Sequence, residues 1–308
     1  MNTFTLIFAL GVTLAIPILW VALGEVIFEQ SGVLNIGVEG VMVFGAFAAA
    51  IGYRYAGNNL YVGLLAGIGA GVISGVVLSI VYVSLGMDQI VAGIMINVFV
   101  IGFTAALYGK YLGGGVAGTL REVDVPLLSR IPYLGKILFQ HNFLVYAAIL
   151  IAPLVWYLMW RTWFGLYARA ASEMPRAVES SGVNVLGIRY VAVMLGSILT
   201  AVGGATLVLT TSGGFATGLT SGRGFIALAV VVLARWNPFW VVLGCLLFGV
   251  TQALQFQIEN LGFLSHIPSD FMLALPYAVT IVAVVFARSS RYPAACGVPY
   301  RPPGAVRS

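Results

Sequence analysis

Residues 61–85 read YVGLLAGIGAGVISGVVLSIVYVSL, a run that contains no charged side chain. A helix needs about 20 mostly apolar residues to cross the hydrocarbon core of a bilayer, and this run is long enough. A transmembrane β-strand would instead alternate apolar and polar residues over about ten positions, which this continuously apolar run does not do. The stretch therefore predicts a transmembrane α-helix and indicates that the surrounding chain folds in a membrane.

The composition of the whole chain agrees with this class. Of its 308 residues, 60% are hydrophobic and only 8% are charged, whereas soluble domains carry about 25% charged residues. Further apolar runs lie near residues 5–24, 33–52, 89–108, 143–160, 190–210, 223–256 and 270–287. Arg235-Trp236-Asn237-Pro238 interrupts the run 223–256, which predicts two shorter helices there. We expect an all-α polytopic membrane protein with about nine transmembrane segments, made of a membrane domain (1–288) and a basic tail (289–308).

Basic residues are expected to mark the cytoplasmic side of a membrane protein. They gather in the loop 161–189 and at the C-terminal end, as Arg161, Arg169, Arg176, Arg189, Arg288, Arg291, Arg301 and Arg307. We therefore expect the loop and the C-terminus to be cytoplasmic, with Met1 and the loop 109–142 outside. The outer loop disagrees in one respect, because it carries Lys110, Arg121, Arg130 and Lys136. Basic residues distributed in this way indicate membrane topology rather than nucleic-acid binding.

Four glycines recur at every fourth residue of the run 61–85: Gly63, Gly67, Gly71 and Gly75. Residues four apart lie on one face of a helix, so these glycines form a single line, called here the glycine ridge. Small residues let the backbones of two membrane helices approach closely. The glycine ridge therefore predicts helix packing rather than ligand binding.

Motifs for enzymatic chemistry are absent from the sequence. A P-loop needs a lysine followed by Ser or Thr, and neither Lys110 nor Lys136 is so followed. The two histidines, His141 and His266, and the two cysteines, Cys245 and Cys296, show no metal-ligand spacing and no arrangement for nucleophilic catalysis. We expect a chain that is not an enzyme, holds no metal or cofactor and does not itself hydrolyse ATP.

Polar side chains inside two of the apolar runs are candidates for a translocation pathway. Asn35 and Glu39 fall in the run 33–52, and Gln89 and Asn97 in the run 89–108. A charge at the centre of a membrane helix costs about 2.5–3.5 kcal/mol, so an acid such as Glu39 calls for an explanation. If the run is helical, Asn35 and Glu39 share one face, where they could line the pathway. Alternatively Glu39 is solvated at the membrane interface or joins two helices, and Asn97 forms an interhelical hydrogen bond.

The loop 161–189 contains a second unusual stretch. Pro175 suits the first turn of a helix and Gly182 suits the residue after its end. The helix between them would have about two turns, on the order of 10 Å, which is too short to cross a bilayer. A short surface helix of mixed charge suits docking onto a soluble partner, although a solvated connector would have the same pattern.

Several stretches together resemble one transporter family. The run 24–40, GEVIFEQSGVLNIGVEG, resembles the N-terminal signature of permeases in bacterial ABC importers of nucleosides, within the ribose and branched-chain amino acid permease superfamily. Further stretches resemble the family in the same order: 89–97, 161–184, 222–229, 235–238 and 299–302. The loop departs from the family at one point, where Ser172-Glu173-Met174-Pro175 replaces the usual Gly-Glu-Asn-Pro. The resemblance extends over nearly the whole chain.

This resemblance implies a permease with a type II ABC importer-like fold in the bacterial inner membrane, which carries nucleosides and forms half of the pathway. It also implies that the segment 173–182 is a coupling helix that docks on a separate ATPase subunit through Glu173, Pro175, Arg176, Glu179 and Gly182. The implied partners are this ATPase, which uses ATP, a second paralogous permease and an extracytoplasmic substrate-binding protein. Other possible cargoes are a simple sugar or a riboflavin-like compound. Two other classes stay open, an ion-coupled secondary transporter that uses Glu39 and a non-transporting membrane scaffold.

Overall fold

The structure is a computed structural model and describes residues 3–113, 119–120, 123–124, 134–261, 278 and 292–301. The described chain is mostly helical, with one short antiparallel strand pair in which Val123 lies opposite His141. The α-helices are α1 (Thr3–Gln30), α2 (Val38–Tyr55), α3 (Leu60–Leu78), α4 (Gln89–Tyr111), α5 (Leu134–Leu138), α6 (Phe143–Arg161), α7 (Trp163–Glu173), α8 (Pro175–Ser180), α9 (Val185–Thr206), α10 (Arg223–Leu233) and α11 (Pro238–Leu261). Two π-helical turns, η1 (Ser79–Ser84) and η3 (Leu207–Ser212), extend α3 and α9, and the strands are β1 (Val123–Asp124) and β2 (Gln140–His141).

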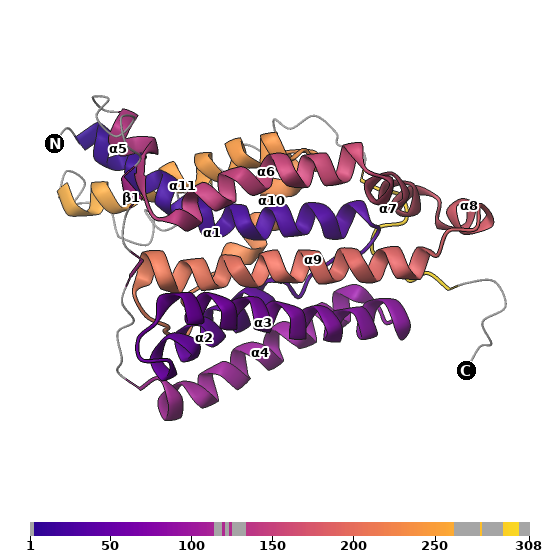
Figure 1. Cartoon of the computed structure of the whole chain (residues 1–308), viewed down its shortest axis with the longest axis horizontal. Helices are drawn as coiled ribbons and strands as arrows, with labels where there is room; N and C mark the ends of the chain where they lie inside the picture. Colours follow the sequence, from indigo (N-terminus) through magenta and orange to yellow (C-terminus); the bar gives the residue numbers. More distant parts are fainter. Residues whose placement is uncertain are drawn as a thin grey trace.

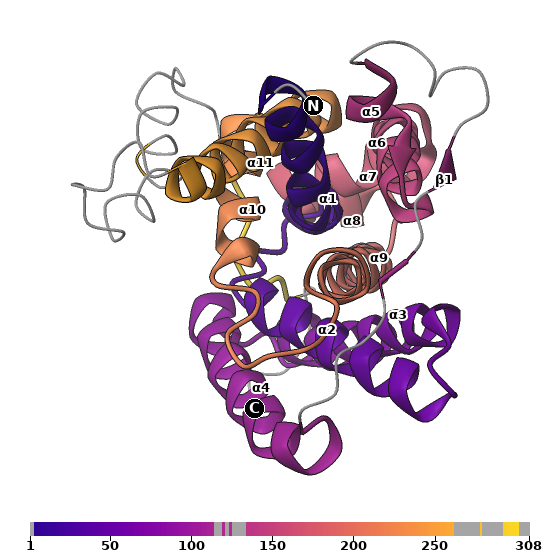
Figure 2. The ribbon, with the colours of Figure 1, turned by 90° about the vertical axis from the view of Figure 1, so that its left-hand side faces the viewer.

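The long helices lie side by side along the long axis of the molecule (Figure 1). Helix α9 runs through the middle of the bundle and packs against α1, α2 and α3, as the end-on view in Figure 2 shows. The start of α1 lies with α5 and β1 at one end, and α7 and α8 lie at the opposite end (Figure 1). The loop predicted to carry a surface helix therefore projects from the end of the bundle opposite the start of α1.

Six helical segments in the described part of the chain are long and apolar enough to cross a membrane. They are Phe4–Gln30, Leu60–Ser84, Gln89–Tyr111, Phe143–Arg161, Val185–Ser212 and Pro238–Gln257. This confirms a polytopic α-helical membrane protein. The predicted division of the run 223–256 is also confirmed, because α10 ends at Leu233 and α11 begins at Pro238.

The predicted number of about nine segments is not reached in the described residues. Helix α10 has only 11 residues and is about 16 Å long, roughly half of the thickness of a hydrocarbon core. Helix α2 begins five residues later than predicted and carries Glu39 in its first turn and Arg54 in its last, so it falls outside the six. The predicted segment 270–287 lies outside the described residues, apart from residue 278.

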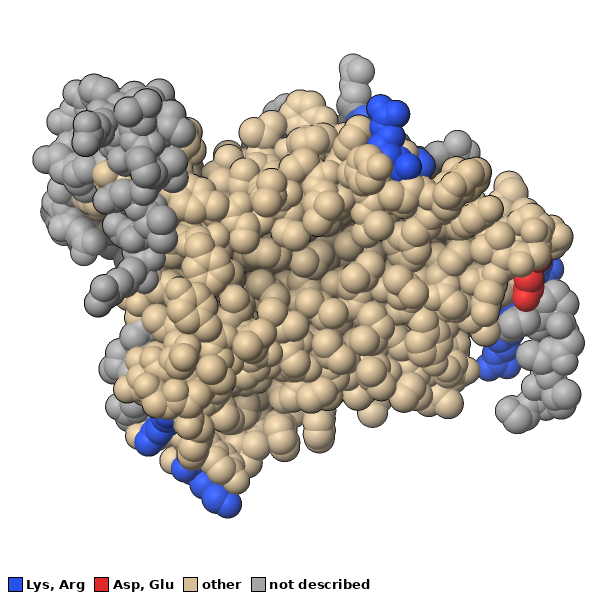
Figure 3. Space-filling view, viewed as in Figure 1, with Lys and Arg blue, Asp and Glu red and all other residues tan. Residues whose placement is uncertain are grey.

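The outer surface of the bundle is suited to lipid. In Figure 3 the middle of the visible face carries no charged side chain, and the Lys, Arg, Asp and Glu residues seen there lie near its edges. Helix α4 exposes large apolar side chains, among them Val98 at 68% and Phe99 at 67%. In water such a surface would be costly, whereas in a bilayer it meets apolar acyl chains.

The glycine ridge of α3 is buried and faces α2 and α9. A Cβ added at Gly67 would lie 2.7 Å from Ala205 Cβ, and one added at Gly71 would lie 2.7 Å from Ile198 Cα. Both distances are shorter than a carbon–carbon contact of about 3.5–4.0 Å. The close approach of α3 to α9 therefore depends on the absence of side chains at these positions.

We predict that Gly67→Leu lowers the melting temperature of the purified protein, because the added side chain forces α3 away from α9. Overpacking of this kind costs about 1–3 kcal/mol or more. Gly69→Leu is the matched control, since an added Cβ at Gly69, on the same helix, would have no neighbour within 4 Å. Equal melting temperatures for the two variants in the same detergent would contradict the packing role of the ridge.

Candidate translocation site and coupling loop

The chain is not helical between α1 and α2. Helix α1 ends at Gln30, and α2 begins at Val38, so the prediction of one helix from residue 33 is wrong at its start. Gly32 adopts a left-handed φ of 84°, and Val33 N donates to Phe28 O at 3.1 Å, which closes the end of α1. Asn35 therefore lies in the break, called here the α1–α2 break (residues 31–37), and does not share a helical face with Glu39.

Buried side chains from α1 and α4 bond two of the polar groups of the α1–α2 break. Asn35 is fully buried and its Nδ2 donates to Glu25 Oε1 of α1 at 2.8 Å. Gln89, at the start of α4, accepts a hydrogen bond from Leu34 N at 2.7 Å. Inside a membrane there is no water to bond these groups, so such contacts are required. The sequence did not single out Glu25 as a site residue, although it lies in the run 24–40.

Asn97 holds the other side of the break from α4. Its Oδ1 accepts from Gly40 N and its Nδ2 donates to Ile36 O, each at 2.7 Å. Gly93, one turn earlier on α4, lets the two segments touch, because an added Cβ would lie 2.7 Å from Gly37 N. The structure shows an interhelical hydrogen bond of the kind expected for Asn97, between α4 and Gly40 of α2, and both partners of Asn97 are backbone groups rather than another side chain.

Glu39 binds the N-terminus of α10. Its Oε1 accepts from Gly222 N at 3.0 Å and from the Thr220 hydroxyl, and its Oε2 accepts from Gly224 N at 2.8 Å. The first N–H groups of a helix lack partners within the helix and carry partial positive charge, so they form a natural site for a carboxylate. Gly222 has no side chain with which to cap α10, and Glu39 takes this role from another helix. The structure places Glu39 between two helices, which is one of the alternatives given for it above, and only 5% of its surface is exposed.

A cavity of about 150 Å³ lies beside Glu39, between α2, α4 and the segment 213–222. Its lining residues are Glu39, Val43, Ile101, Thr104, Phe215, Ala216, Thr217, Gly218, Leu219, Thr220, Ser221 and Gly222. Four of them carry hydroxyl groups, and one, Phe215, is an aromatic residue. The Phe215 ring is held edge-on by Phe47 at a centroid distance of 5.3 Å. This mixture of an aromatic wall and hydrogen-bonding groups is typical of sites for small polar ligands.

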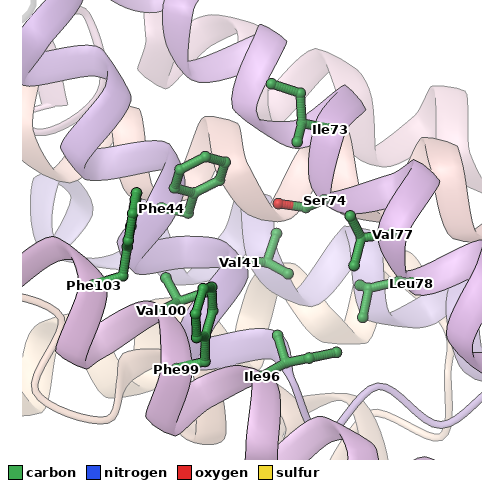
Figure 4. A pocket seen from close by; sticks show the side chains of 10 residues that line it. All are labelled: Val41, Phe44, Ile73, Ser74, Val77, Leu78, Ile96, Phe99, Val100 and Phe103. Atoms are coloured by element: carbon green, nitrogen blue, oxygen red, sulfur yellow. The ribbon is translucent and has the colours of Figure 1, made fainter.

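A larger groove of about 260 Å³ on α2, α3 and α4 has a different character. Its lining consists of apolar side chains apart from the hydroxyl of Ser74 (Figure 4). Three phenylalanines contribute to it, namely Phe44, Phe99 and Phe103. Because it offers almost no hydrogen-bonding group, a polar cargo would lose its hydration there without compensation. The cavity beside Glu39 is therefore the better candidate for a polar pathway.

The loop 161–189 contains two helices rather than one. Helix α8 begins at Pro175, as predicted, and Gly182 follows its end with a left-handed φ of 84°. Before it comes α7, which was not predicted from the sequence and which begins where the Thr162 hydroxyl accepts from Gly165 N at 3.3 Å. Glu173 is the last residue of α7, so the segment 173–182 is a helix end, a short helix and a turn.

Opposite charges are exposed at the end of α7 and on α8. Glu173 and Arg176 are exposed, whereas Val178 is buried against the rest of the loop. Glu179 is half-buried and accepts a hydrogen bond from the hydroxyl of Tyr300 in the C-terminal segment. Within the part of the chain that the structure describes, no three His, Cys, Asp or Glu residues are grouped in a way that could hold a metal ion.

Comparison with known proteins assigns the family. Residues 7–284 match the family described as branched-chain amino acid transport system / permease component. The guanosine ABC transporter permease NupQ of Bacillus subtilis is 34% identical over 93% of each chain. The nucleoside ABC transporter permease NupC of Lactococcus lactis is 32% identical over 97% of this chain and 98% of its own length. A putative glucose ABC transporter permease, TsgC13 of Haloferax volcanii, is 33% identical over 80% of this chain and 76% of its own. No solved structure matches significantly.

These matches cover nearly the whole chain and agree with the six helices, among the described residues, that are long and apolar enough to cross a membrane. The chain belongs to the permease component family of branched-chain amino acid transport systems and is a membrane-embedded transport subunit of the ABC permease class.

Proposed function

We propose that this chain is the permease subunit of an ATP-driven nucleoside importer, with ATP hydrolysed by a separate subunit. Two full-length relatives are named for guanosine and nucleoside transport, and the site carries chemistry that suits such a cargo. The observation that supports the proposal most directly is the cavity beside Glu39, which is lined by Phe215 and by residues that carry hydroxyl groups. A nucleoside combines a flat base, which stacks on aromatic rings, with a sugar that bonds hydroxyl groups.

The contacts of Glu39 favour an uncharged cargo. Its carboxylate already accepts three hydrogen bonds from the start of α10, so its charge is balanced inside the protein. An ion-coupling acid would instead need free acceptors for its ion or proton. The same contacts therefore argue against the alternative of a secondary transporter.

A single chain supplies only part of a cargo site. The cavity measures about 150 Å³, and sites for small molecules usually measure about 300–1,000 Å³. We propose that a second, paralogous permease completes the pathway and that an extracytoplasmic binding protein delivers the cargo. We also propose that 270–287 forms another membrane segment, giving about nine in a type II importer-like fold.

The orientation and the ATPase contact belong to the same proposal. The start of α1 and the α7–α8 loop lie at opposite ends of the bundle (Figure 1). We place α7, α8 and the C-terminus on the cytoplasmic side of the bacterial inner membrane, because arginines gather there. Helix α8 then serves as the coupling helix, with Glu173 and Arg176 facing the ATPase.

Uptake of a labelled nucleoside should fall in cells that lack this chain and return with the wild-type gene. It should persist when an ionophore removes ion gradients, as long as ATP remains. Phe215→Ala should raise the KM about tenfold, because stacking of a base on an aromatic ring contributes about 1–3 kcal/mol. Phe99→Ala, on the exposed face of α4, is the matched control and should leave the KM unchanged.

Competition with unlabelled compounds identifies the cargo in the same assay. Inhibition by glucose or riboflavin, with none by nucleosides, would assign one of the alternative cargoes. Loss of uptake on adding the ionophore, at constant ATP, would support a secondary transporter. Unchanged uptake in cells that lack the chain, with no other nucleoside importer present, would contradict the proposal.

Replacement of Glu39 separates a structural acceptor from an ion-coupling acid. Glu39→Ala leaves three donors without an acceptor, and each unpaired donor costs about 1–3 kcal/mol. The melting temperature should therefore fall, and most of the uptake should be lost. Glu39→Gln keeps one carbonyl acceptor and should retain partial uptake. Initial rates are compared at matched membrane abundance, with and without the ionophore. A Gln variant as inactive as the Ala variant, together with dependence on an ion gradient, would assign ion coupling.

Single cysteines on the exposed face of α8 should crosslink to the ATPase subunit. Suitable positions are Met174, Arg176 and Ala177, in a background where Cys296 is replaced by Ser and the buried Cys245 is kept. A cysteine at the exposed Asn58, in the turn between α2 and α3 at the other end of the bundle, is the control. Failure of every α8 position to crosslink would show that α8 is not the coupling helix.

A further inference from the structure

We infer that residues 292–301, called here the tail strap, are a second element of the coupling machinery, in which Tyr300 positions α8. This inference rests on the proposed function and extends it to a segment with no assigned role. The tail strap lies at the same end of the bundle as α7 and α8 (Figure 1). Its contacts run from the turn between α10 and α11, across α7 and α9, to α8.

The first half of the tail strap is fixed to the helix bundle. The Tyr292 ring packs edge-on against Trp236 at a centroid distance of 5.2 Å, and the Trp236 indole N–H donates to Glu29 near the end of α1. Further along, Ala295 N donates to Ser172 O of α7 at 2.7 Å. These contacts join the tail strap to the helix that precedes the α1–α2 break and to the helix that precedes α8.

Arg189 of α9 holds the second half of the tail strap. It is only 2% exposed, and its Nη1 donates to Val298 O at 3.2 Å. The guanidinium lies 5.9 Å from the centre of the Tyr300 ring, within the range of a cation–π contact. On its other side, an added Cβ at Gly32 would lie 2.7 Å from Arg189 Nη2. Arg189 therefore lies between the tail strap and the α1–α2 break, and a buried charge depends strongly on such partners.

Tyr300 connects the tail strap to α8. The residue is 8% exposed and packs in a small core with Val178 of α8 and two other buried residues, Ala171 and Val185. Its hydroxyl donates to Glu179. Burial, together with this carboxylate, raises the pKa of Tyr300 to about 12, so the phenol keeps its proton and remains a donor at physiological pH. A helix of six residues is not stable alone, so its position depends on contacts of this kind.

The tail strap also shapes the surface that α8 presents. A groove of about 620 Å³ is lined by Met174, Pro175, Arg176, Ala177, Val298, Pro299, Tyr300 and Arg301. One wall belongs to α8 and the other to the tail strap, and each wall carries an exposed arginine, Arg176 or Arg301. An ATPase surface that seats an apolar side chain here, with acidic residues beside it, would contact both walls. Movement of the tail strap would then change the surface to which the ATPase couples.

The test measures cargo imported per ATP hydrolysed, using the complete complex with its ATPase in proteoliposomes. Tyr300→Phe keeps the ring and removes only the hydroxyl, and it should lower this ratio about tenfold, the equilibrium effect of losing one hydrogen bond to a charged group. Tyr300→Ala should lower it further, while the ATPase still copurifies with the permease. Glu179→Ala should match Tyr300→Phe, and the double variant should be no worse than either single one, since both remove the same bond. Glu179→Gln, which keeps an acceptor, should restore most of the ratio.

Tyr55→Phe, which changes an exposed tyrosine at the end of α2, is the control and should leave the ratio unchanged. A wild-type ratio in both Tyr300→Phe and Tyr300→Ala would overturn the inference. If Tyr300→Ala fails to assemble, Tyr300→Phe decides, because its ring still fills the core. Absence of ATP-dependent uptake by the wild-type complex would instead reject the proposed function, so the two failures are distinguishable.

Discussion

A polypeptide inside the hydrocarbon core of a membrane has no water with which to satisfy its backbone N–H and C=O groups. The α1–α2 break places such groups inside the bundle, and the buried amides of Gln89 and Asn97 on α4 bond two of them and the N–H of Gly40 in the first turn of α2. Because the break is held in this way, α2 starts at a depth where Glu39 meets α10. Helix α10 can then be too short to cross a membrane, which leaves room beyond its N-terminus for the polar cavity.

Much of the helical framework was predictable because it follows from local properties of the chain. Apolar length alone located α3, α4, α6 and α9, the turn-forming residues 235–238 divided α10 from α11, and Pro175 marked the start of α8. The start of α2 was not predictable in this way, since the residues after 33 are apolar enough to continue a helix. Hydrogen bonds from α4, which lies 55 or more residues away in sequence, fix the non-helical path there.

The candidate site shows the same division between local and distant causes. Asn35, Glu39, Gln89 and Asn97 could be singled out because polar groups are rare and costly inside apolar runs. Their roles depend on partners that a single sequence does not reveal, such as Gly224, which lies 185 residues after Glu39. Phe215 carried no signal of its own, because one more aromatic residue in an apolar chain is unremarkable. Tyr300 was included in the family resemblance, but its contact with Glu179 is visible only in the structure.

Both ends of α10 are held by acids from the same stretch of sequence. Glu39 binds the N-terminus of α10, and Glu29 accepts from Trp236 just after its C-terminus. A helix of 11 residues is nearly rigid along its length, so displacement at one end has to be accommodated at the other. One end borders the polar cavity, and the other contacts Tyr292 of the tail strap, which leads to α8. A short helix held between two acids therefore links the polar cavity physically to the end of the molecule that carries α7 and α8.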